Sequence, residues 1–334
     1  MVVPPYTPSE GRYETGLPIR RAGRSGIRLP EVVLGLWHNF GDTAPYARSR
    51  EMILHSFDQG IVHFDLANNY GPSYGSAEET FGKVMKKDLR PYRHELFIST
   101  KAGWDMFPGH YGNWGSRKYL MTSLEESLRR MKLDEVDIFY SHRYDPETPL
   151  EETMQALVDI VRSGKARYAG ISNYPADKAH EAYAYLEARD VHCLLYQGRY
   201  SMMNREPETA VIPEAAEAGV GFVAFSPLAQ GLLTNRYFGG IPQDSRAAED
   251  RTLKAERITP ELVAQLRRLD AIAASRGQSL AQMALAWDLR DPRVTSVIIG
   301  ASSVAQIDDN LKATRNTAFS EEELSQIDGI LSQL

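Results

Sequence analysis

The chain has 334 residues, a hydrophobic fraction of 43% and a net charge of −6 at pH 7. This hydrophobic content supports a large core and excludes an intrinsically disordered chain. The acidic balance argues against a nucleic-acid-binding surface, which would need clustered basic residues. An α/β barrel commonly forms one domain of more than about 250 residues, so we expect residues 1–334 to form a single domain.

The one cysteine, Cys193, cannot form an internal disulfide, which indicates a reducing compartment. It lies in an apolar run, so a buried and inert thiol is expected. The first residues show no basic and apolar signal segment, and no apolar run approaches the length of a membrane span. We therefore expect a soluble cytoplasmic protein.

Short apolar runs alternate with amphipathic stretches along the chain. The runs are nearly continuous in hydrophobicity, as expected of parallel strands covered on both faces. They are EVVLGL (31–36), IVHFD (61–65), LFISTK (96–101), VDIFYSH (136–142), ARYAGIS (166–172), HCLLYQ (192–197), VGFVAFS (220–226) and VTSVIIG (294–300).

The stretches between the runs carry helix-capping patterns. Ser76 and Glu79 predict a capping box at the start of one helix. Another helix is predicted to have Thr148 as N-cap, Pro149 as its first residue and Gly164 just beyond its end.

Eight repeats of strand and helix predict an α/β fold, a (β/α)8 TIM barrel, with an open doubly wound sheet as the competing architecture. Residues 17–30 resemble an N-terminal β-hairpin that closes one end of the barrel. The long loop after strand 7, residues 227–260, suggests a lid or ligand loop. The segment GVGFVA (219–224) imitates a dinucleotide motif, but it ends a helix and opens a strand, so Gly219 is interpreted as a helix C-cap.

Polar side chains stand where the predicted strands end. In a parallel barrel these ends meet at one mouth, where barrel enzymes place their chemistry. The residues concerned are Asp65, Tyr70, Lys101, His142, Arg143, Ser172, Asn173, Gln197, Ser226, Gly300 and Ser302.

Four of these residues suggest an acid-catalysed reaction at an oxygen atom. Taken singly, Asp65 could cap a turn, Tyr70 could lie on the rim and His142 could be a core histidine. A lysine that ends a buried strand, however, needs an anionic partner. An Asp65–Lys101 pair would lower the pKa of the Tyr70 phenol and strengthen it as a proton donor. His142 could orient the same substrate oxygen. The set has neither an activated nucleophile nor metal-ligand spacing.

The tetrad Asp65, Tyr70, Lys101 and His142 resembles that of the aldo-keto reductase superfamily. The motifs FDLANNYG, STK, GISNY, FSPLAQGLL and GIPQDSRA extend the resemblance over almost the whole chain. GLWHNFG, YGPSYGSAEE and RGQSLAQMALAW are similar to the branch that holds bacterial L-glyceraldehyde 3-phosphate reductases and potassium-channel β-subunits. The resemblance implies the (β/α)8 fold, the N-terminal hairpin and an NADPH cofactor.

The resemblance also implies which residues would contact that cofactor. Ser172, Asn173 and Gln197 would hold the carboxamide, and Phe225 would lie against the nicotinamide. The remaining cofactor contacts would be Trp37, Asp65, Ser226, Leu228, Gln230, Gly231, Leu232, Arg236, Arg246, Gly300, Ser302, Gln306 and Asn310.

The adenosine end departs from the pattern of the hydroxysteroid-type reductases. Those enzymes have a lysine and an arginine where this chain has Gly300 and Gln306. The expectation of NADPH over NADH therefore depends on Arg236 and Arg246. Ser303 and Gln306 also form a capping-box pattern, and a helix N-terminus can serve both purposes.

Three functions remain open from the sequence. The first is reduction of small aldehydes, including a phosphorylated triose, with Trp37, Tyr70, Tyr74, His142 and Arg143 at the substrate. For Arg143, a salt bridge at the barrel rim is the alternative role. The second is a redox-sensing subunit of the channel type, and the third is detoxification of carbonyls such as methylglyoxal. The resemblance further implies a homo-oligomer, a tetramer or octamer.

Overall fold

In the computed structural model, residues 6–243, 245–249 and 252–333 are described. Eight parallel strands in this part of the chain close into a barrel, in the order β10-β3-β4-β5-β6-β7-β8-β9. This confirms the predicted TIM barrel, and each predicted run overlaps one strand, although β5 and β8 extend one and two residues beyond their runs. The strands are β3 (Val32–Gly35), β4 (His63–Asp65), β5 (Phe97–Ala102), β6 (Val136–Ser141), β7 (Ala166–Ser172), β8 (Cys193–Arg199), β9 (Gly221–Phe225) and β10 (Val294–Ile299).

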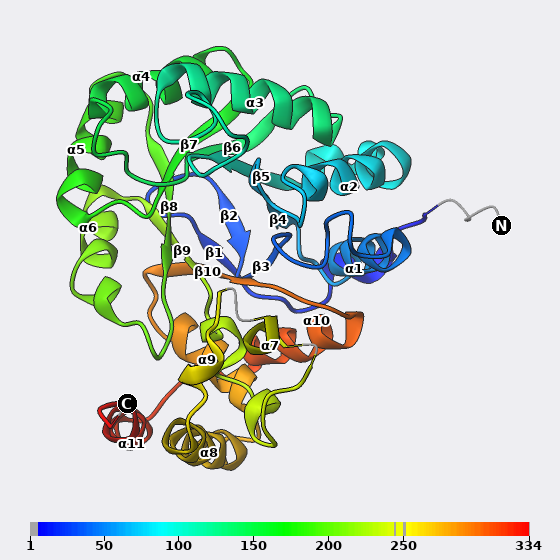
Figure 1. Ribbon diagram of the computed structural model, residues 1–334, viewed down its shortest axis with the longest axis vertical. Coiled ribbons are helices and arrows are strands. Elements are labelled where there is room, and N and C mark those ends of the chain that lie inside the picture. Colours follow the sequence, from blue (N-terminus) through cyan, green and yellow to red (C-terminus); the bar gives the residue numbers. More distant parts are fainter. Residues whose placement is uncertain (1–5, 244, 250–251, 334) are drawn as a thin grey trace.

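Helices surround the barrel and cover the outer faces of its strands (Figure 1). Their buried apolar faces, with the outer faces of the strands, form the largest core cluster. The helices are α1 (Tyr46–Asp58), α2 (Ser76–Val84), α3 (Arg117–Met131), α4 (Leu150–Arg162), α5 (Ala176–Glu187), α6 (Val211–Ala218), α7 (Arg246–Glu249), α8 (Pro260–Ser275), α9 (Leu280–Leu289), α10 (Val304–Leu311) and α11 (Glu321–Leu331).

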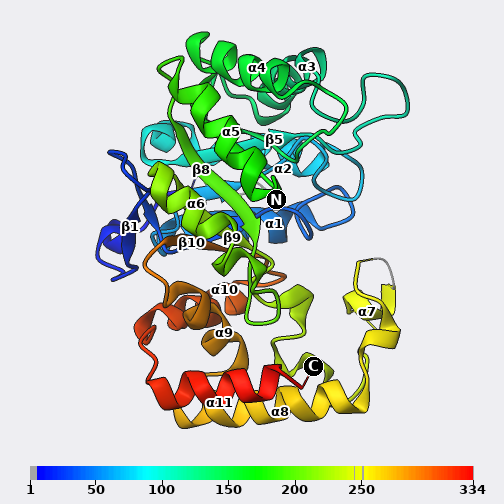
Figure 2. The same cartoon turned by 90° about the vertical axis from the view of Figure 1, so that its left-hand side faces the viewer.

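The N-terminal hairpin closes one end of the barrel, as predicted. Strands β1 (Ile19–Arg21) and β2 (Arg28–Pro30) pair antiparallel. Ala22 and Leu29 from the hairpin pack against Phe97 and Leu195, which lie near the beginnings of β5 and β8. Figure 2 shows β1 on one side of the barrel and α7 on the opposite side. The end that the hairpin closes is therefore unavailable, and the opposite mouth is where a ligand can enter.

Two predicted helix starts are wrong by one residue. The capping box at Ser76 does not form, because Gly75, with φ of 89°, is the N-cap of α2 and Ser76 is already helical. Helix α4 has Pro149 as N-cap, while the Thr148 hydroxyl donates to Asp145 instead. In both cases the preceding loop sets the entry direction. Gly219 does end α6, in the left-handed conformation with φ of 77°.

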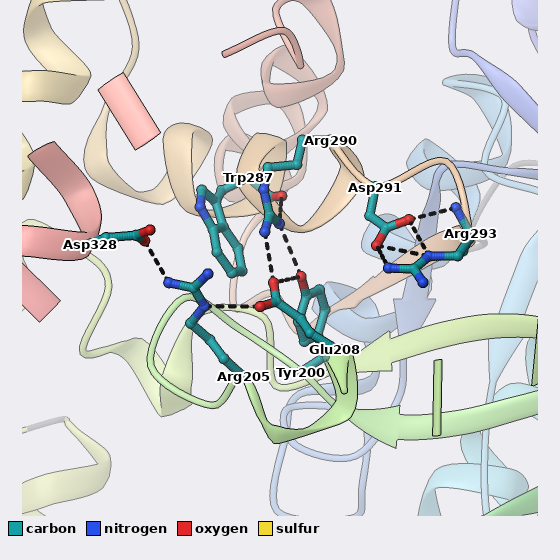
Figure 3. A network of polar contacts seen from close by, with 8 residues as sticks. All are labelled: Tyr200, Arg205, Glu208, Trp287, Arg290, Asp291, Arg293 and Asp328. Carbon is teal, nitrogen blue, oxygen red and sulfur yellow. Dashed lines mark hydrogen bonds and ion pairs between the residues drawn. The ribbon is translucent and has the colours of Figure 1, made fainter. Parts of the chain in front are cut away.

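A polar network joins the segment after β8 to the end of α9 (Figure 3). Glu208 accepts hydrogen bonds from Tyr200 at 2.7 Å, Arg290 at 2.6 Å and Arg205 at 3.1 Å. Arg290 also stacks on Trp287, at 3.5 Å from its guanidinium carbon to the ring centre. One carboxylate thus fixes two arginines between distant segments.

None of the helices in the described residues is both long and apolar enough to cross a membrane.

Candidate active site

Asp65 and Lys101 form a buried ion pair at the end of β4 and β5. Lys101 Nζ lies 2.7 Å from Asp65 Oδ2 and also donates to the Leu66 carbonyl. The two side chains are almost fully buried, with 0% and 2% of their surfaces exposed. Burial lowers the pKa of Lys101, and the charge of Asp65 opposes that shift. The structure therefore contains the predicted pairing of Lys101 with an anion.

Tyr70 lies directly above this pair. Lys101 Nζ is 4.7 Å from the centre of the Tyr70 ring. The predicted lowering of the phenol pKa is wrong for this structure, since burial raises the pKa of Tyr70 well above its ordinary value and Asp65 adds to the shift. Desolvation and the nearby carboxylate both disfavour a phenolate, so the hydroxyl keeps its proton at neutral pH.

His142 completes the group at the end of β6. Its ring stands edge-on to that of Tyr70, with 6.0 Å between centroids. Burial lowers the pKa of His142 well below its ordinary value, and Lys101 and Arg143 lower it further. Its Nδ1 is buried and has no hydrogen-bond partner among the described residues. The ring is therefore neutral, with one nitrogen able to donate toward a substrate oxygen.

The residues at the ends of β7 and β8 form a connected set. Gln197 Nε2 donates to Asp65 Oδ1 at 2.9 Å. Asn173, with φ of 55°, donates from Nδ2 to the His142 carbonyl at 3.1 Å and to Ser172 Oγ at 3.0 Å. These three predicted residues thus lie beside the tetrad, and their hydrogen bonds hold its members in place.

A cavity of about 1170 Å³ begins at Asp65 and Tyr70 and extends toward the N-terminus of α10. Most of the residues that the family resemblance implied as cofactor contacts line it. Those residues are Trp37, Asp65, Phe225, Ser226, Leu228, Gln230, Gly231, Arg236, Arg246, Gly300, Ser302, Gln306 and Asn310.

Several predicted contact residues do not line this cavity, namely Leu232, Tyr74, His142, Arg143, Ser172, Asn173 and Gln197. Leu232 is buried and packs with Tyr237, Ala247 and Leu253 in a small separate core, so it stabilises the long loop after β9. Tyr74 is 55% exposed and does not line the cavity. Its position after the tetrad tyrosine suggested a wall, but the turn at residues 71–75 directs this side chain to the surface.

Arg143 lies between two tryptophan rings. Its guanidinium carbon is 3.8 Å from the Trp104 ring centre and 3.5 Å from that of Trp114. Arg143 Nε donates to the Gly103 carbonyl at 2.8 Å, and Nη2 donates to Asn113 Oδ1 at 2.7 Å. Among the described residues no carboxylate forms an ion pair with Arg143. These residues therefore do not form the alternative salt bridge at the barrel rim. The stacking fixes the loop after β5 over the mouth.

Sequence reasoning missed several residues that line the cavity. Asn39, Thr43 and Arg48 follow the first barrel strand, and the strand-end rule applied to that strand could have found them. Asp270 and Ser279 belong to helices α8 and α9 or their junction. Ser279 lies in the motif RGQSLAQMALAW, but neither residue was assigned a contact, because only the packing of the helices brings them to the cavity.

The long loop after β9 brings a cation across the cavity. Arg246 in α7 places its guanidinium carbon 5.7 Å from the Trp37 ring centre. A side-chain carbon added at Gly300 would lie 3.8 Å from Arg246 Nη2, so the guanidinium also lies near the end of β10. Arg246 therefore lies between Trp37 and the end of β10, and its assignment to the adenosine end of the cofactor stays a prediction.

The residues present suit a dinucleotide. Ser226, Ala229 and Gln230 all have positive φ values, 56°, 46° and 61°, which is uncommon outside glycine and often marks a ligand site. Gln230 Oε1 is buried with no partner in the described part of the chain. At the other end of the cavity, Ser303 caps α10, whose N-terminus favours an anion. The cavity is thus lined by strained backbone at Ser226 and Gln230 and by residues of the first turns of α10.

No group of three or more His, Cys, Asp or Glu side chains within residues 6–243, 245–249 and 252–333 is arranged to hold a metal ion.

Comparison with known proteins agrees with the fold and the geometry. Residues 31–332 match the model of the aldo/keto reductase family. The chain is 50% identical over 315 residues to L-glyceraldehyde 3-phosphate reductase of Escherichia coli (strain K12), covering 92% of this chain and 91% of that protein. It is 34% identical to a probable voltage-gated potassium channel subunit beta of Arabidopsis thaliana, covering 88% of this chain and 90% of that protein. The chain therefore belongs to the aldo/keto reductase family of oxidoreductases.

Proposed function

We propose that this protein reduces small aldehydes with NADPH, and that L-glyceraldehyde 3-phosphate or a close analogue is its substrate. The observation that carries the proposal is the buried Asp65–Lys101 pair, with its ammonium against the Tyr70 ring, beside a cavity of about 1170 Å³. The similarity to a protein named L-glyceraldehyde 3-phosphate reductase supports the choice of substrate.

Tyr70 is the proton donor in this proposal. Its raised pKa keeps the hydroxyl protonated until an oxygen that gains negative charge lies beside it. The Lys101 ammonium, 4.7 Å from the ring centre, stabilises the negative charge that then develops on the phenol oxygen. Asp65 keeps the ammonium in place and charged. A bound nicotinamide would supply the hydride for the carbonyl carbon.

His142 orients the carbonyl group. A neutral imidazole can donate one hydrogen bond to the substrate oxygen without competing with Tyr70 for the role of acid. The lowered pKa of His142 supports this division, since a histidine that stays neutral across the physiological range does not exchange the transferred proton.

The preference for NADPH rests on arginines that line the cavity. Arg48, Arg236 and Arg246 bring positive charge to it, while Glu249, Asp270 and Asp309 bring negative charge. Asp309 already accepts a hydrogen bond from Gln282 and pairs with Lys312, which reduces its effect on a ligand. Aldo-keto reductases use NADH or NADPH, and a 2′-phosphate would be favoured by the guanidinium groups.

We propose that Arg143 binds the phosphate group of the substrate. The tryptophan rings cover both faces of its guanidinium group, and two of its N–H groups bond to Gly103 and Asn113. The outer edge of the group remains for an anion next to His142. Removal of the guanidinium from water strengthens such a contact, and burial already lowers its pKa.

The other two functions that the sequence left open share the cofactor site. A carbonyl-detoxifying reductase would act equally well on methylglyoxal and on a phosphorylated aldehyde. A redox-sensing subunit would bind the cofactor and turn over slowly, and the similarity to a probable voltage-gated potassium channel subunit beta keeps this alternative open. The homo-oligomer expected from the sequence stays a prediction.

One assay separates these possibilities. Oxidation of NADPH is followed with L-glyceraldehyde 3-phosphate, unphosphorylated glyceraldehyde and methylglyoxal, and each assay is repeated with NADH. The proposal expects the highest kcat/KM with the phosphorylated aldehyde and NADPH. Equal kcat/KM for all three aldehydes would favour the detoxifying enzyme, and tight cofactor binding without turnover would favour the sensor.

A further inference from the structure

Four polar side chains form a continuous line inside the barrel. Along a strand, alternate residues point to the same face, so His63 and Asp65 share the inner face of β4, and Ser99 and Lys101 share that of β5. Asp65 and Ser99 are register partners in the paired strands. All four are at most 1% exposed. The line thus runs from His63 below the site to Lys101 within it.

Each step of this line is a hydrogen bond. His63 Nε2 lies 3.2 Å from Ser99 Oγ, and Ser99 Oγ lies 2.8 Å from Asp65 Oδ1. Asp65 Oδ2 then accepts from Lys101 Nζ at 2.7 Å. Gln197 also donates to Asp65 Oδ1. The carboxylate therefore has one oxygen for the ammonium and one oxygen held by Ser99 and Gln197.

The protons of this line can be placed. Ser99 has one hydroxyl proton, and the carboxylate oxygen at 2.8 Å is a closer and stronger acceptor than the Phe64 carbonyl at 3.3 Å. If that proton points to Asp65, His63 must donate to Ser99 from Nε2. Burial lowers the pKa of His63 to about 4, so the ring is neutral and its buried Nδ1, which has no partner among the described residues, is the unprotonated nitrogen.

We propose that Ser99, itself oriented by the Nε2–H tautomer of His63, is a positioning residue that fixes the Asp65 carboxylate beneath Tyr70. This inference rests on the proposed function. Ser99 touches neither the cavity nor Tyr70; it acts through Asp65, whose orientation decides where the Lys101 ammonium sits. The alternative is that Ser99 has only a structural role as a buried serine, and the experiment must distinguish the two roles.

A pH profile of kcat reports on all the titratable groups that lie near Asp65 and Lys101. The titratable groups that face Asp65 and Lys101 are His63 on β4, Tyr70 on the following loop, Glu78 on α2, and Tyr140 and His142 at β6. Loss of the Ser99 hydroxyl changes the hydrogen bonding inside this coupled set, so the pH profile of kcat should differ from that of the wild type.

The decisive comparison is Ser99→Ala against Ser296→Ala. Ser296 is also fully buried in a barrel strand, and its hydroxyl donates to the Pro30 carbonyl at 2.7 Å, remote from the tetrad. Both variants lose one buried hydroxyl, so both should unfold at somewhat lower temperature. Only Ser99→Ala should lower kcat, by about 10-fold, while KM for the aldehyde stays within about twofold. Only this variant should change the pH profile of kcat.

A second measurement does not depend on activity. Nitrogen-15 NMR of the histidine side chains in the full chain should show the Nε2–H tautomer for His63 at neutral pH, assigned by comparison with a His63→Gln variant. The Nδ1–H tautomer would overturn the inference, because Ser99 would then donate to His63 and not to Asp65. Equal kcat values and pH profiles for the two serine variants would overturn it as well.

The Tyr70→Phe variant distinguishes a failure of the proposed function from a failure of the role assigned to Ser99. If Tyr70→Phe retained wild-type turnover, the assignment of the whole tetrad would fall, and this inference with it. If Tyr70→Phe abolished turnover while Ser99→Ala behaved like Ser296→Ala, the tetrad would stand and only the role of Ser99 would be refuted.

Discussion

The Lys101 ammonium lies 4.7 Å from the centre of the Tyr70 ring, under a phenol whose pKa is raised. Burial is the main cause of that shift, and the cation sits where it can stabilise negative charge once the proton has left. Before the reaction Tyr70 is therefore protonated, and the Lys101 ammonium lies close enough to stabilise the phenolate that forms when the proton is transferred.

Replacement of Tyr70 by Phe removes the proton donor and leaves the ring. We expect kcat for aldehyde reduction to fall by at least about 100-fold, in line with the contribution of a positioned general acid. The dissociation constant for NADPH, measured by the quenching of tryptophan fluorescence, should change by less than about twofold. Equal turnover in the variant and the wild type would refute the assignment of the acid.

Replacement of Arg143 by Ala tests how the substrate phosphate is read. We expect KM for L-glyceraldehyde 3-phosphate to rise about 10- to 100-fold, because a charged hydrogen bond is lost. KM for unphosphorylated glyceraldehyde should rise much less.

Trp114→Leu is the control for Arg143, since it disturbs the loop stacking and keeps the guanidinium. This variant should affect the two aldehydes equally. If Arg143→Ala also raised both KM values equally, its role would be to order the loop and not to bind the anion.

Replacement of Arg246 by Ala tests cofactor selection. The side chain reaches from α7 to Trp37 and Gly300 across the cavity. We expect KM for NADPH to rise about 10-fold and KM for NADH to change little, because only NADPH carries the additional phosphate. A parallel rise for both cofactors would place Arg246 at the pyrophosphate that the two share.

Replacement of Glu208 by Gln tests the network in Figure 3. The change removes the charge that holds Arg205 and Arg290, and we expect the free energy of unfolding to fall by about 1–3 kcal/mol. Glu125→Gln, at the exposed pair with Lys165, should cost less than about 1 kcal/mol. Chemical denaturation measures both, and kcat should not change in either variant. A loss of stability no greater than that of Glu125→Gln would show that the network contributes little.

Asp288 makes the stability of the fold depend on pH. Its side chain is fully buried in α9, both of its oxygens lack hydrogen-bond partners among the described residues, and burial raises its pKa well above 3.8. The folded state therefore binds a proton that the unfolded state has released, and this group's contribution weakens as pH rises from about 4 toward the raised pKa.

An isosteric neutral residue removes that dependence. We expect Asp288→Asn to be stabilised relative to the wild type more at pH 8 than at pH 5, as measured by the midpoint of thermal unfolding. A constant difference between the two proteins at both pH values would mean that Asp288 does not hold a proton in the folded state.

The order of elements and the position of the tetrad could be predicted from the sequence. Continuous apolar runs indicate strands covered on both faces, and capped amphipathic stretches indicate helices. Because the carboxyl ends of parallel strands meet at one mouth, the residue that ends each run is placed by local sequence alone. Asp65, Lys101 and His142 were found in this way, and each stands within one residue of the end of its strand in the structure.

The tertiary structure decided what those residues contact and what charge they carry. Gln197 bonds Asp65 across 132 residues of chain, and Arg143 is stacked between two tryptophans of another loop. Periodicity does not register such contacts, since it reports which face of an element is buried and not which side chains meet there. The protonation of Tyr70 depends in turn on desolvation, which exists only once the barrel has closed.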